Sequence, residues 1–407
     1  MKYIDGGVTA PAGFKTAACA AGIKKNNTLD MAMIYSIVPC VAAGTFTQNV
    51  VKAAPVLWDR DIVYNSEYAQ AVVCNSGIAN ACTGKEGMDA CADAAKAVSA
   101  ALKIPEKSVL VCSTGVIGAQ LPTEKIAAGI ENMAGTLCDT RDAAALAAKA
   151  IMTTDTMPKE VAVTVEIGGM TVTIAGMCKG SGMIHPNMCT MLSFLTTDAD
   201  ITHEMLQAAL SEVVPDTYNM VTVDGDTSTN DTVLLLANGL AGNPAIREKD
   251  DHYALFVKAL LEVNTVLAKK IASDGEGATA LFEVKMTGCA DKQQAVTLAR
   301  SVVGSSLTKA AIYGHDANWG RIIAAMGYSG AEFDPEKVDL WFESAAGKIK
   351  IAENGLSASY DEEEATRILS QNEVTVIADL KMGSAAATAW GCDLTYDYVK
   401  INADYRS

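Results

Sequence analysis

Apolar residues recur at helical spacing in several stretches of the chain, which is typical of amphipathic helices. One of these stretches, MDACADAAKAVSAALK, stops before Pro105, a residue that cannot continue a helix. The same pattern predicts further helices over TEKIAAGIENMAGTL, RDAAALAAKAIMTTD, residues 203–213, 252–272 and 291–303, and DEEEATRIL.

Short apolar runs rich in β-branched residues predict strands. SVLVCSTGVIG is expected to be a strand that delivers Ser113, Thr114 and Gly115 into a loop. VAVTVEIGGMTVTIAGM alternates apolar and polar residues on both sides of Gly168–Gly169, which predicts a β-hairpin. The first 60 residues are predicted to be rich in turns, with short apolar segments only. Further strands are expected in AQAVVCNSGIANACTG, TMLSFLTTD, VLLLAN, TALFEVKMTG, KVDLWFESAAGKIKIAENG and EVTVIADL.

The order of elements changes after the helix near 252–272, where strands and helices form a compact α+β unit. We place the domain boundary there, with one domain over 1–287 and a smaller one over 288–407. The last segment, YDYVKINADYRS, is expected to end as a strand that is tied down at a site.

Composition and charge exclude several classes of function. Half of the 407 residues are apolar and 6% are aromatic, which is typical of an α/β protein. The formal charge of -16 would repel both a nucleic-acid backbone and an anionic membrane. No apolar run reaches the roughly 18 residues of a membrane span, and the first residues lack the pattern of a signal peptide. We therefore expect a cytoplasmic protein with no nucleic-acid or membrane partner.

The eleven cysteines are odd in number and contain no C-x-x-C pair, so we expect them to be reduced and mostly buried. The closest approach to a metal cluster is Cys74, Cys82 and Cys91. Their wide spacing and the absence of a nearby histidine argue against zinc, so no metal is expected.

The segment KGSGMIHPNMCTMLSFLTTDAD changes from a Gly- and Pro-rich loop to a buried strand at Cys189–Thr190. Three chemical interpretations compete here. A phosphate-binding loop lacks the required spacing and following helix, and a thiol–imidazole pair of Cys189 and His185 would be unusually close in sequence. In the third, the Thr190 hydroxyl attacks the Cys189 carbonyl and the chain cleaves itself. The freed α-amine, with a reference pKa of about 7.7–8.0, then serves as base for its own hydroxyl. A purely structural threonine is the alternative that this segment alone leaves open.

Motifs along the whole chain favour the third interpretation. The chain resembles the ornithine acetyltransferase family, the glutamate N-acetyltransferases of arginine biosynthesis, over essentially all 407 residues. The resemblance is carried, in order, by GGVTAPAGFKTAACAAGIKK, AAGTFTQNVVKAAPV, NSGIANACTG, STGVIG, IMTTDTMPK, KGSGMIHPNMCTML, VDGDTSTNDT, SDGEGATALFEV, DANWGRI and YDYVKINADYRS.

The resemblance implies a fold, a maturation step and a reaction. The fold would be an αββα sandwich like that of N-terminal nucleophile hydrolases, followed by a smaller C-terminal α+β domain. The precursor would cleave itself into an α chain (1–189) and a β chain (190–407), which assemble as an α2β2 heterotetramer. The enzyme would move an acetyl group from N-acetylornithine to glutamate by a ping-pong mechanism without a cofactor. Some members also use acetyl-CoA as donor, and the sequence leaves both alternatives open.

The resemblance also assigns residues. Thr190 would be the nucleophile, and Thr114 and Gly115 would form the oxyanion hole. A charge-based argument agrees for two of the substrate-binding positions, because Lys179 can pair with a carboxylate and Glu276 with an ammonium group. Each of these two alone could equally be a surface or capping residue. The positions that would contact substrate are Thr153, Lys179, Thr190, Glu276, Asn402 and Ser407.

Departures from the family pattern are Cys189, where the family mostly has alanine, Ile78, where it mostly has asparagine, and Ser407, where it often has threonine. His185 is expected to shape the loop, and His203, His252 and His315 to be surface or capping residues. Asp316, Asn318 and Arg321 are expected to form a buried polar network. Two other functions are weighed: an amidohydrolase or aminopeptidase of the same self-processing fold, and an uncleaved small-molecule binding protein.

Overall fold

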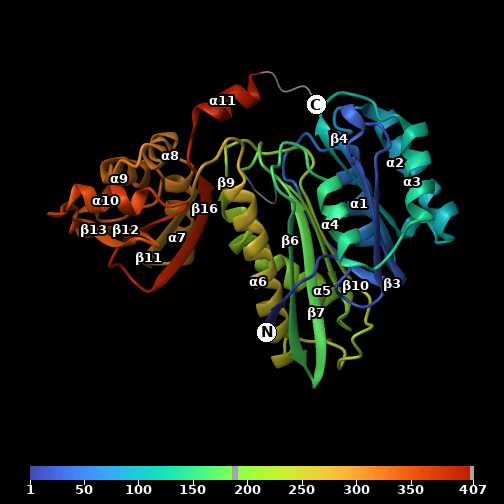
Figure 1. Cartoon of the computed structure of the whole chain (residues 1–407). Coiled ribbons are helices and arrows are strands. Elements are labelled where there is room, and N and C mark those ends of the chain that lie inside the picture. Colours follow the sequence, from blue (N-terminus) through green and yellow to red (C-terminus); the bar gives the residue numbers. More distant parts are fainter. Residues whose placement is uncertain (186–190, 404–407) are drawn as a thin grey trace.

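The computed structural model describes residues 1–185 and 191–403, apart from the side chain of Asn26. Its strands form two sheets, and helices flank both of them (Figure 1). None of the helices in these two ranges is long and apolar enough to cross a membrane.

The first sheet has the strand order β1-β6-β7-β8-β10-β3-β4-β5, and β2 also pairs with β3. Strand β3 joins two halves of this sheet: Met31–Tyr35 pair with β4, and Val41–Phe46 pair with β10. The register shifts between Tyr35 and Cys40, where Pro39 lies in the strand without breaking it. The strands are β1 (Lys2–Ile4), β2 (Phe14–Cys19), β3 (Met31–Phe46), β4 (Ala69–Ile78), β5 (Val109–Val116), β6 (Lys159–Ile167), β7 (Met170–Lys179), β8 (Leu192–Thr197) and β10 (Thr232–Ala237).

Alternation along the strands separates three cores. On β3, Ala32 and Ile34 face a core between the two halves of the sheet, where they meet Phe194 and Leu234. Their neighbour Met33 faces a second core under helices α2 and α3, and the outer face of β6 to β10 packs under α5 and α6. The layers are therefore helices, one half of the first sheet, its other half, and helices again. The expected αββα sandwich is confirmed.

The helices that apolar spacing predicted begin and end within a few residues of the expected positions, whereas α1, α8, α9 and α11 were not predicted. α5 covers His203–Val213, with the Thr202 side chain accepting a hydrogen bond from the Met205 backbone as N-cap. The helices are α1 (Ala54–Asn65), α2 (Gly84–Leu102), α3 (Thr123–Ala134), α4 (Arg141–Ala150), α5, α6 (Asp251–Ser273), α7 (Lys292–Val303), α8 (Ser306–Tyr313), α9 (Trp319–Gly327), α10 (Glu362–Leu369) and α11 (Tyr396–Asn402). Short 3-10 helices cover Lys25–Asn27, Glu106–Ser108, Val214–Asp216, Tyr218–Met220 and Pro335–Lys337.

The second sheet has the order β14-β13-β12-β15-β11-β16-β9 and forms most of the orange and red unit in Figure 1. Its strand β9 comes from the chain before α6, so the two units are interwoven. The expected boundary at 287/288 falls inside β11, and a domain division there stays a prediction. The strands are β9 (Val221–Thr222), β11 (Leu281–Cys289), β12 (Asp339–Ser344), β13 (Gly347–Glu353), β14 (Leu356–Ser357), β15 (Glu373–Asp379) and β16 (Ala385–Cys392).

Two local expectations were wrong. The first 60 residues contain the long strand β3 and the start of helix α1 rather than short segments between turns. Residues 396–402 of the C-terminal segment form helix α11 instead of a strand, with Lys400 3.6 Å from Asp397 one turn earlier.

Candidate active site

A pocket of about 130 Å³ lies where strand ends and loops from both halves of the first sheet meet helix α11. It brings together six of the predicted site residues from five separate segments. These residues are Thr114, Gly115, Thr153, Lys179, Glu276 and Asn402. Met191, which directly follows the predicted nucleophile, also lines it. The predicted residues Cys189, Thr190 and Ser407 lie outside the described residues.

Thr114 and Gly115 are the two residues before Val116, the last residue of β5, and are not members of a following loop as expected. The register between β4 and β5 shifts at Ile78, so the ladder is irregular beside them. Gly115 has a φ of +132°, and a Cβ there would lie 2.2 Å from the carbonyl carbon of Gly77. Only glycine therefore fits at this position.

Buried polar contacts fix the strand end that carries Thr114. Ser113 Oγ donates to Asn75 Oδ1 at 2.6 Å, and Asn230 Nδ2 donates to the carbonyls of Ala79 (2.6 Å) and Ser113 (2.8 Å). Asp59, fully buried on α1, accepts from Val111 N at 2.6 Å further back along β5. Burial raises the pKa of Asp59 to about 8, although the hydrogen bonds from Val111 and Cys112 act to lower it. Sequence reasoning missed Asp59, Asn75 and Asn230.

Two oppositely charged side chains line the pocket. Lys179 ends β7 and is only 7% exposed, yet its ammonium makes no hydrogen bond or ion pair with any residue in 1–185 or 191–403. Glu276 is also 7% exposed, and its carboxylate accepts a hydrogen bond from Asn402 Nδ2 at 2.7 Å. A buried charge without a partner is costly, so Lys179 favours an anionic ligand group.

Helix α11 lies at the top of the molecule in Figure 1, apart from the other helices of the C-terminal unit. It is held at the pocket by contacts at both ends. At its start, Thr395 Oγ1 donates to the Gly277 carbonyl at 2.7 Å, and at its end Asn402 contacts Glu276. The expected tying-down of the C-terminal segment at the site therefore holds, although the segment is helical.

Asp231 is a pocket-lining acid that sequence reasoning missed. It precedes β10, and the next residue, Thr232, donates its backbone N–H to the Met191 carbonyl at 2.9 Å. Asp231 is 1% exposed, and its Oδ2 atom has no hydrogen-bond partner among the described residues. Burial raises the pKa of Asp231 well above its usual value, although the nearby Ser228 and Thr47 hydroxyls and the Lys179 charge act to lower it. The acidic motif VDGDTSTNDT was the available signal.

His185 links the loop before the predicted cleavage site to the C-terminal unit. Its Nε2 lies 3.2 Å from Arg300 Nη2 and its Nδ1 lies 3.0 Å from Thr222 Oγ1. Since a guanidinium only donates, Nε2 accepts and Nδ1 carries the proton. Burial and the Arg300 charge lower the pKa of His185, which favours the neutral ring. A loop-shaping role agrees with these contacts.

Several singled-out residues lie away from the pocket. His203 Nε2 lies 3.1 Å from the Val63 carbonyl, and His315 Nδ1 lies 3.3 Å from Ser370 Oγ. The expected buried network of Asp316, Asn318 and Arg321 is wrong. Asp316 is exposed, so its hydrogen bond from Asn318 Nδ2 at 3.1 Å lies at the surface. Arg321 Nη1 instead donates to the Leu307 carbonyl at 2.8 Å.

The comparisons with known proteins bear on this geometry. A sequence model described as ArgJ family matches residues 15–407. The chain belongs to the ArgJ family. The family expected from the sequence motifs is thereby confirmed.

Relatives in the ArgJ family match this chain along its whole length. The arginine biosynthesis bifunctional protein ArgJ of Symbiobacterium thermophilum is 54% identical over 100% of both chains. The protein of the same name from Thermotoga neapolitana is 53% identical over 98% of this chain and 99% of its own. A crystal structure of arginine biosynthesis bifunctional protein ArgJ from Bacillus halodurans superimposes with a TM-score of 0.51 at 50% identity. That match covers 53% of this chain and 99% of the crystallised one.

Proposed function

We propose that the chain is a glutamate N-acetyltransferase of arginine biosynthesis that takes its acetyl group from N-acetylornithine. The observation that carries the proposal is the pocket itself. It holds a buried cation, a buried anion and the strand end of Thr114 and Gly115 beside Met191, in a chain of the ArgJ family. The names of the relatives support the placement in arginine biosynthesis.

The charges suit an amino-acid substrate. Lys179 pairs with the α-carboxylate, which both N-acetylornithine and glutamate carry, and this pairing gives the buried ammonium its missing partner. Glu276, already oriented by Asn402, pairs with the side-chain ammonium of ornithine. Thr153, Asn402 and Ser407 complete the proposed substrate contacts. A cavity of about 130 Å³ has room for small groups and not for a polymer.

The proposed chemistry is covalent. Thr190 Oγ attacks the acetyl carbonyl of N-acetylornithine while the Thr190 α-amine takes the hydroxyl proton, and the resulting ammonium passes this proton to the nitrogen of ornithine as it leaves. The glutamate amine then attacks the acetyl ester and gives a proton to the Thr190 α-amine, which returns it to the departing Thr190 oxygen. Thr114 and Gly115 stabilise the oxyanion in both steps, which suits donors at a rigid strand end.

Maturation is part of the proposal. Cleavage between Cys189 and Thr190 gives chains of 1–189 and 190–407, which assemble as an α2β2 heterotetramer. The crystallised Bacillus halodurans chain is matched over 99% of itself but spans only 53% of this chain, and 190–407 is likewise just over half. This agreement of lengths supports two fragments in the family.

A second donor and a cellular location are also proposed. The relatives are named bifunctional, which supports acetyl-CoA as a further donor to glutamate. The ten cysteines in the described ranges are free thiols, which supports a reducing, cytoplasmic environment.

The covalent intermediate tests the proposal. Processed enzyme mixed with N-acetylornithine alone should gain one acetyl mass on the 190–407 fragment and release about one equivalent of ornithine in a burst. Intact-mass spectrometry and an ornithine assay check both, and glutamate should then discharge the adduct. Steady acetate release without glutamate, at a rate near that of transfer, would favour the amidohydrolase instead. An uncleaved chain that binds ligand without an adduct would favour the binding protein.

Lys179→Met should raise the KM for glutamate by about tenfold to a hundredfold, because a charged hydrogen bond contributes roughly 1.5–3 kcal/mol. Initial rates over a range of glutamate concentrations measure this change. Lys270→Met is the matched control, because the Lys270 ammonium donates to the Glu160 carbonyl at 2.6 Å and does not line the pocket. Equal effects of the two substitutions would contradict a substrate contact at Lys179.

A further inference from the structure

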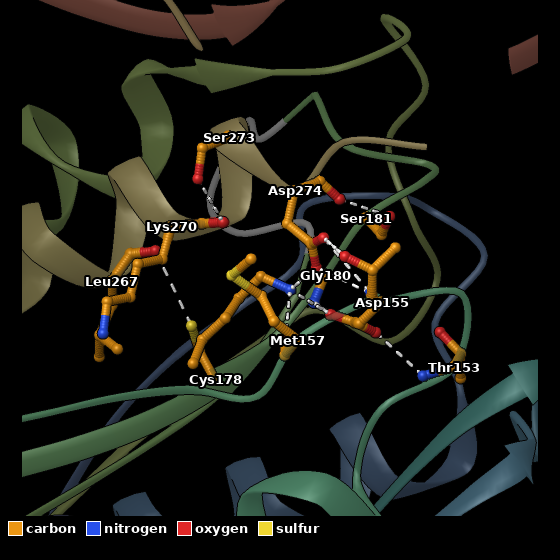
Figure 2. A network of polar contacts seen from close by, with 12 residues as sticks. Thr153, Asp155, Met157, Cys178, Gly180, Ser181, Leu267, Lys270, Ser273 and Asp274 are labelled. Carbon is orange, nitrogen blue, oxygen red and sulfur yellow. Dashed lines mark hydrogen bonds and ion pairs between the residues drawn. The ribbon is translucent and has the colours of Figure 1, made fainter. Parts of the chain in front are cut away.

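Behind the pocket wall lies a buried charge network of Asp155, Lys159 and Asp274 (Figure 2). Lys159 Nζ lies 2.7 Å from Asp155 Oδ1 and 2.5 Å from Asp274 Oδ2. The Lys159 and Asp155 side chains are fully buried, and that of Asp274 is 4% exposed. None of the three lines the pocket, so they are not substrate contacts.

The Asp155 carboxylate holds two pocket segments at once. Its Oδ2 accepts from the backbone N–H of Thr153 at 2.9 Å, and its Oδ1 accepts from the backbone N–H of Gly180 at 2.7 Å. Thr153 lines the pocket, and Gly180 directly follows Lys179. One buried carboxylate therefore sets the distance between these two walls.

Asp274 holds the loop that carries Glu276, the third segment of the pocket wall. Its side chain accepts from the Thr156 backbone N–H at 3.1 Å and from the Thr156 hydroxyl. Its carbonyl accepts from Ser181 Oγ at 2.6 Å, and the Ser181 carbonyl accepts from Glu276 N at 2.9 Å. The loop that carries Glu276 is thus fastened to the loop after Lys179.

The network also matches the charge of the pocket. Burial would raise the pKa of Asp155, but the Lys179 and Lys159 charges hold it below its usual range. The Lys159 ammonium lies between the two carboxylates and makes an ion pair with each of them. Charged groups at this depth need such partners.

We propose that Asp155, Lys159 and Asp274 form a positioning network that sets the spacing of Lys179 and Glu276, and with it the affinity for an amino acid that carries a carboxylate and a side-chain ammonium. This inference rests on the proposed function. In this role the network acts on binding through the pocket walls, whereas Thr114 and Gly115 lie on a strand that it does not contact.

Asp155→Asn and Asp274→Asn test the network, since each leaves Lys159 one carboxylate partner. An asparagine at 155 can accept from only one of the Thr153 and Gly180 segments with its single carbonyl oxygen. We expect the Kd of ornithine, measured by calorimetry on processed enzyme, to rise at least about tenfold in Asp155→Asn, the loss of one charge-assisted hydrogen bond. The KM for glutamate should rise in parallel, with kcat within about threefold. In the Asp155→Asn/Asp274→Asn double variant the Kd of ornithine should rise by less than the product of the two single increases, because the effects of coupled residues are not additive.

Glu160→Gln is the matched control. Glu160 is the next residue on β6, is also buried, and makes an ion pair with Arg141 at 3.0 Å on the other face of the strand. It should lower thermal stability and leave the ornithine Kd within about twofold of wild type. If Asp155→Asn does not fold, Asp274→Asn, which keeps the Asp155–Lys159 pair, carries the test alone.

The outcomes separate the two proposals. Wild-type enzyme that does not bind ornithine would contradict the proposed function. Wild-type binding with an unchanged Kd in the Asn variants, or with the same Kd change in Glu160→Gln, would overturn the positioning network alone.

Discussion

Thr190→Ala protein is expected to purify as one full-length chain and to show no measurable acetyl transfer. The Thr190 hydroxyl is the nucleophile in the proposed cleavage, and the α-amine that cleavage releases is the proposed base for transfer. Thr190→Ala should therefore abolish both chain cleavage and acetyl transfer. Denaturing electrophoresis and intact-mass spectrometry check the chain, and N-acetylglutamate formation checks the activity.

Thr190→Ser is the control for this result, because it retains a hydroxyl at the same position. It should cleave, and its second fragment should begin at residue 190. Two fragments from Thr190→Ala, with the second starting at residue 190, would show that another protease cuts the chain.

Gly115→Ala is expected to lower kcat by about 10²–10³, the effect of losing one oxyanion donor in a protease. A Cβ at this position would lie 2.2 Å from the Gly77 carbonyl carbon and 2.6 Å from Ile78 N, all backbone atoms that cannot rotate away. The end of β5 must therefore shift, and the proposed donors at Thr114 and Gly115 shift with it. Steady-state kinetics should show the change in kcat with a modest change in KM, because Lys179 and Glu276 lie on other segments.

Gly118→Ala is the matched control. Gly118 lies three residues further along, also has a positive φ (+87°), and nothing lies within 4 Å of a Cβ built there. Both substitutions introduce backbone strain, on the order of 1–3 kcal/mol, but only Gly115→Ala moves β5. A similar loss of kcat in both variants would assign the effect to strain and remove Gly115 from the oxyanion hole.

Local periodicity predicted most helices and strands of the sandwich, because amphipathic patterns depend on neighbouring residues only. The hairpin at Gly168–Gly169 is an example, since both glycines have positive φ as its turn requires. Strand β3 contains Pro39, a residue that seldom lies inside a strand, and the register shift beside it lets the strand continue. Helix α11 was missed because Tyr, Val and Ile favour strands, whereas residues 396–402 belong to neither of the two described sheets and are helical.

The candidate site was predicted from motifs, and the residues that support it were not. Lys179 and Glu276 belong to motifs that the family resemblance identified, so their meeting in one pocket could be expected. Asp155 and Lys159 lie in the motif IMTTDTMPK and Asp274 lies in SDGEGATALFEV, but neither motif by itself distinguishes these charges from surface charges or pairs them with one another. Lys159 and Asp274 are 115 positions apart, and only the folded sheet brings them together.

The proposed cut lies between β7 and β8, which are antiparallel neighbours in the sheet. Their pairing runs from Ile174 opposite Thr197 to Lys179 opposite Leu192. Before the cut, a covalent connection keeps these strands at a high effective concentration, and folding is unimolecular. After it, the ladder still holds the two pieces, but a denatured molecule would have to find its other half by diffusion. Folding must therefore come first and cutting second. The mature enzyme would then be kinetically trapped in a fold whose recovery depends on protein concentration.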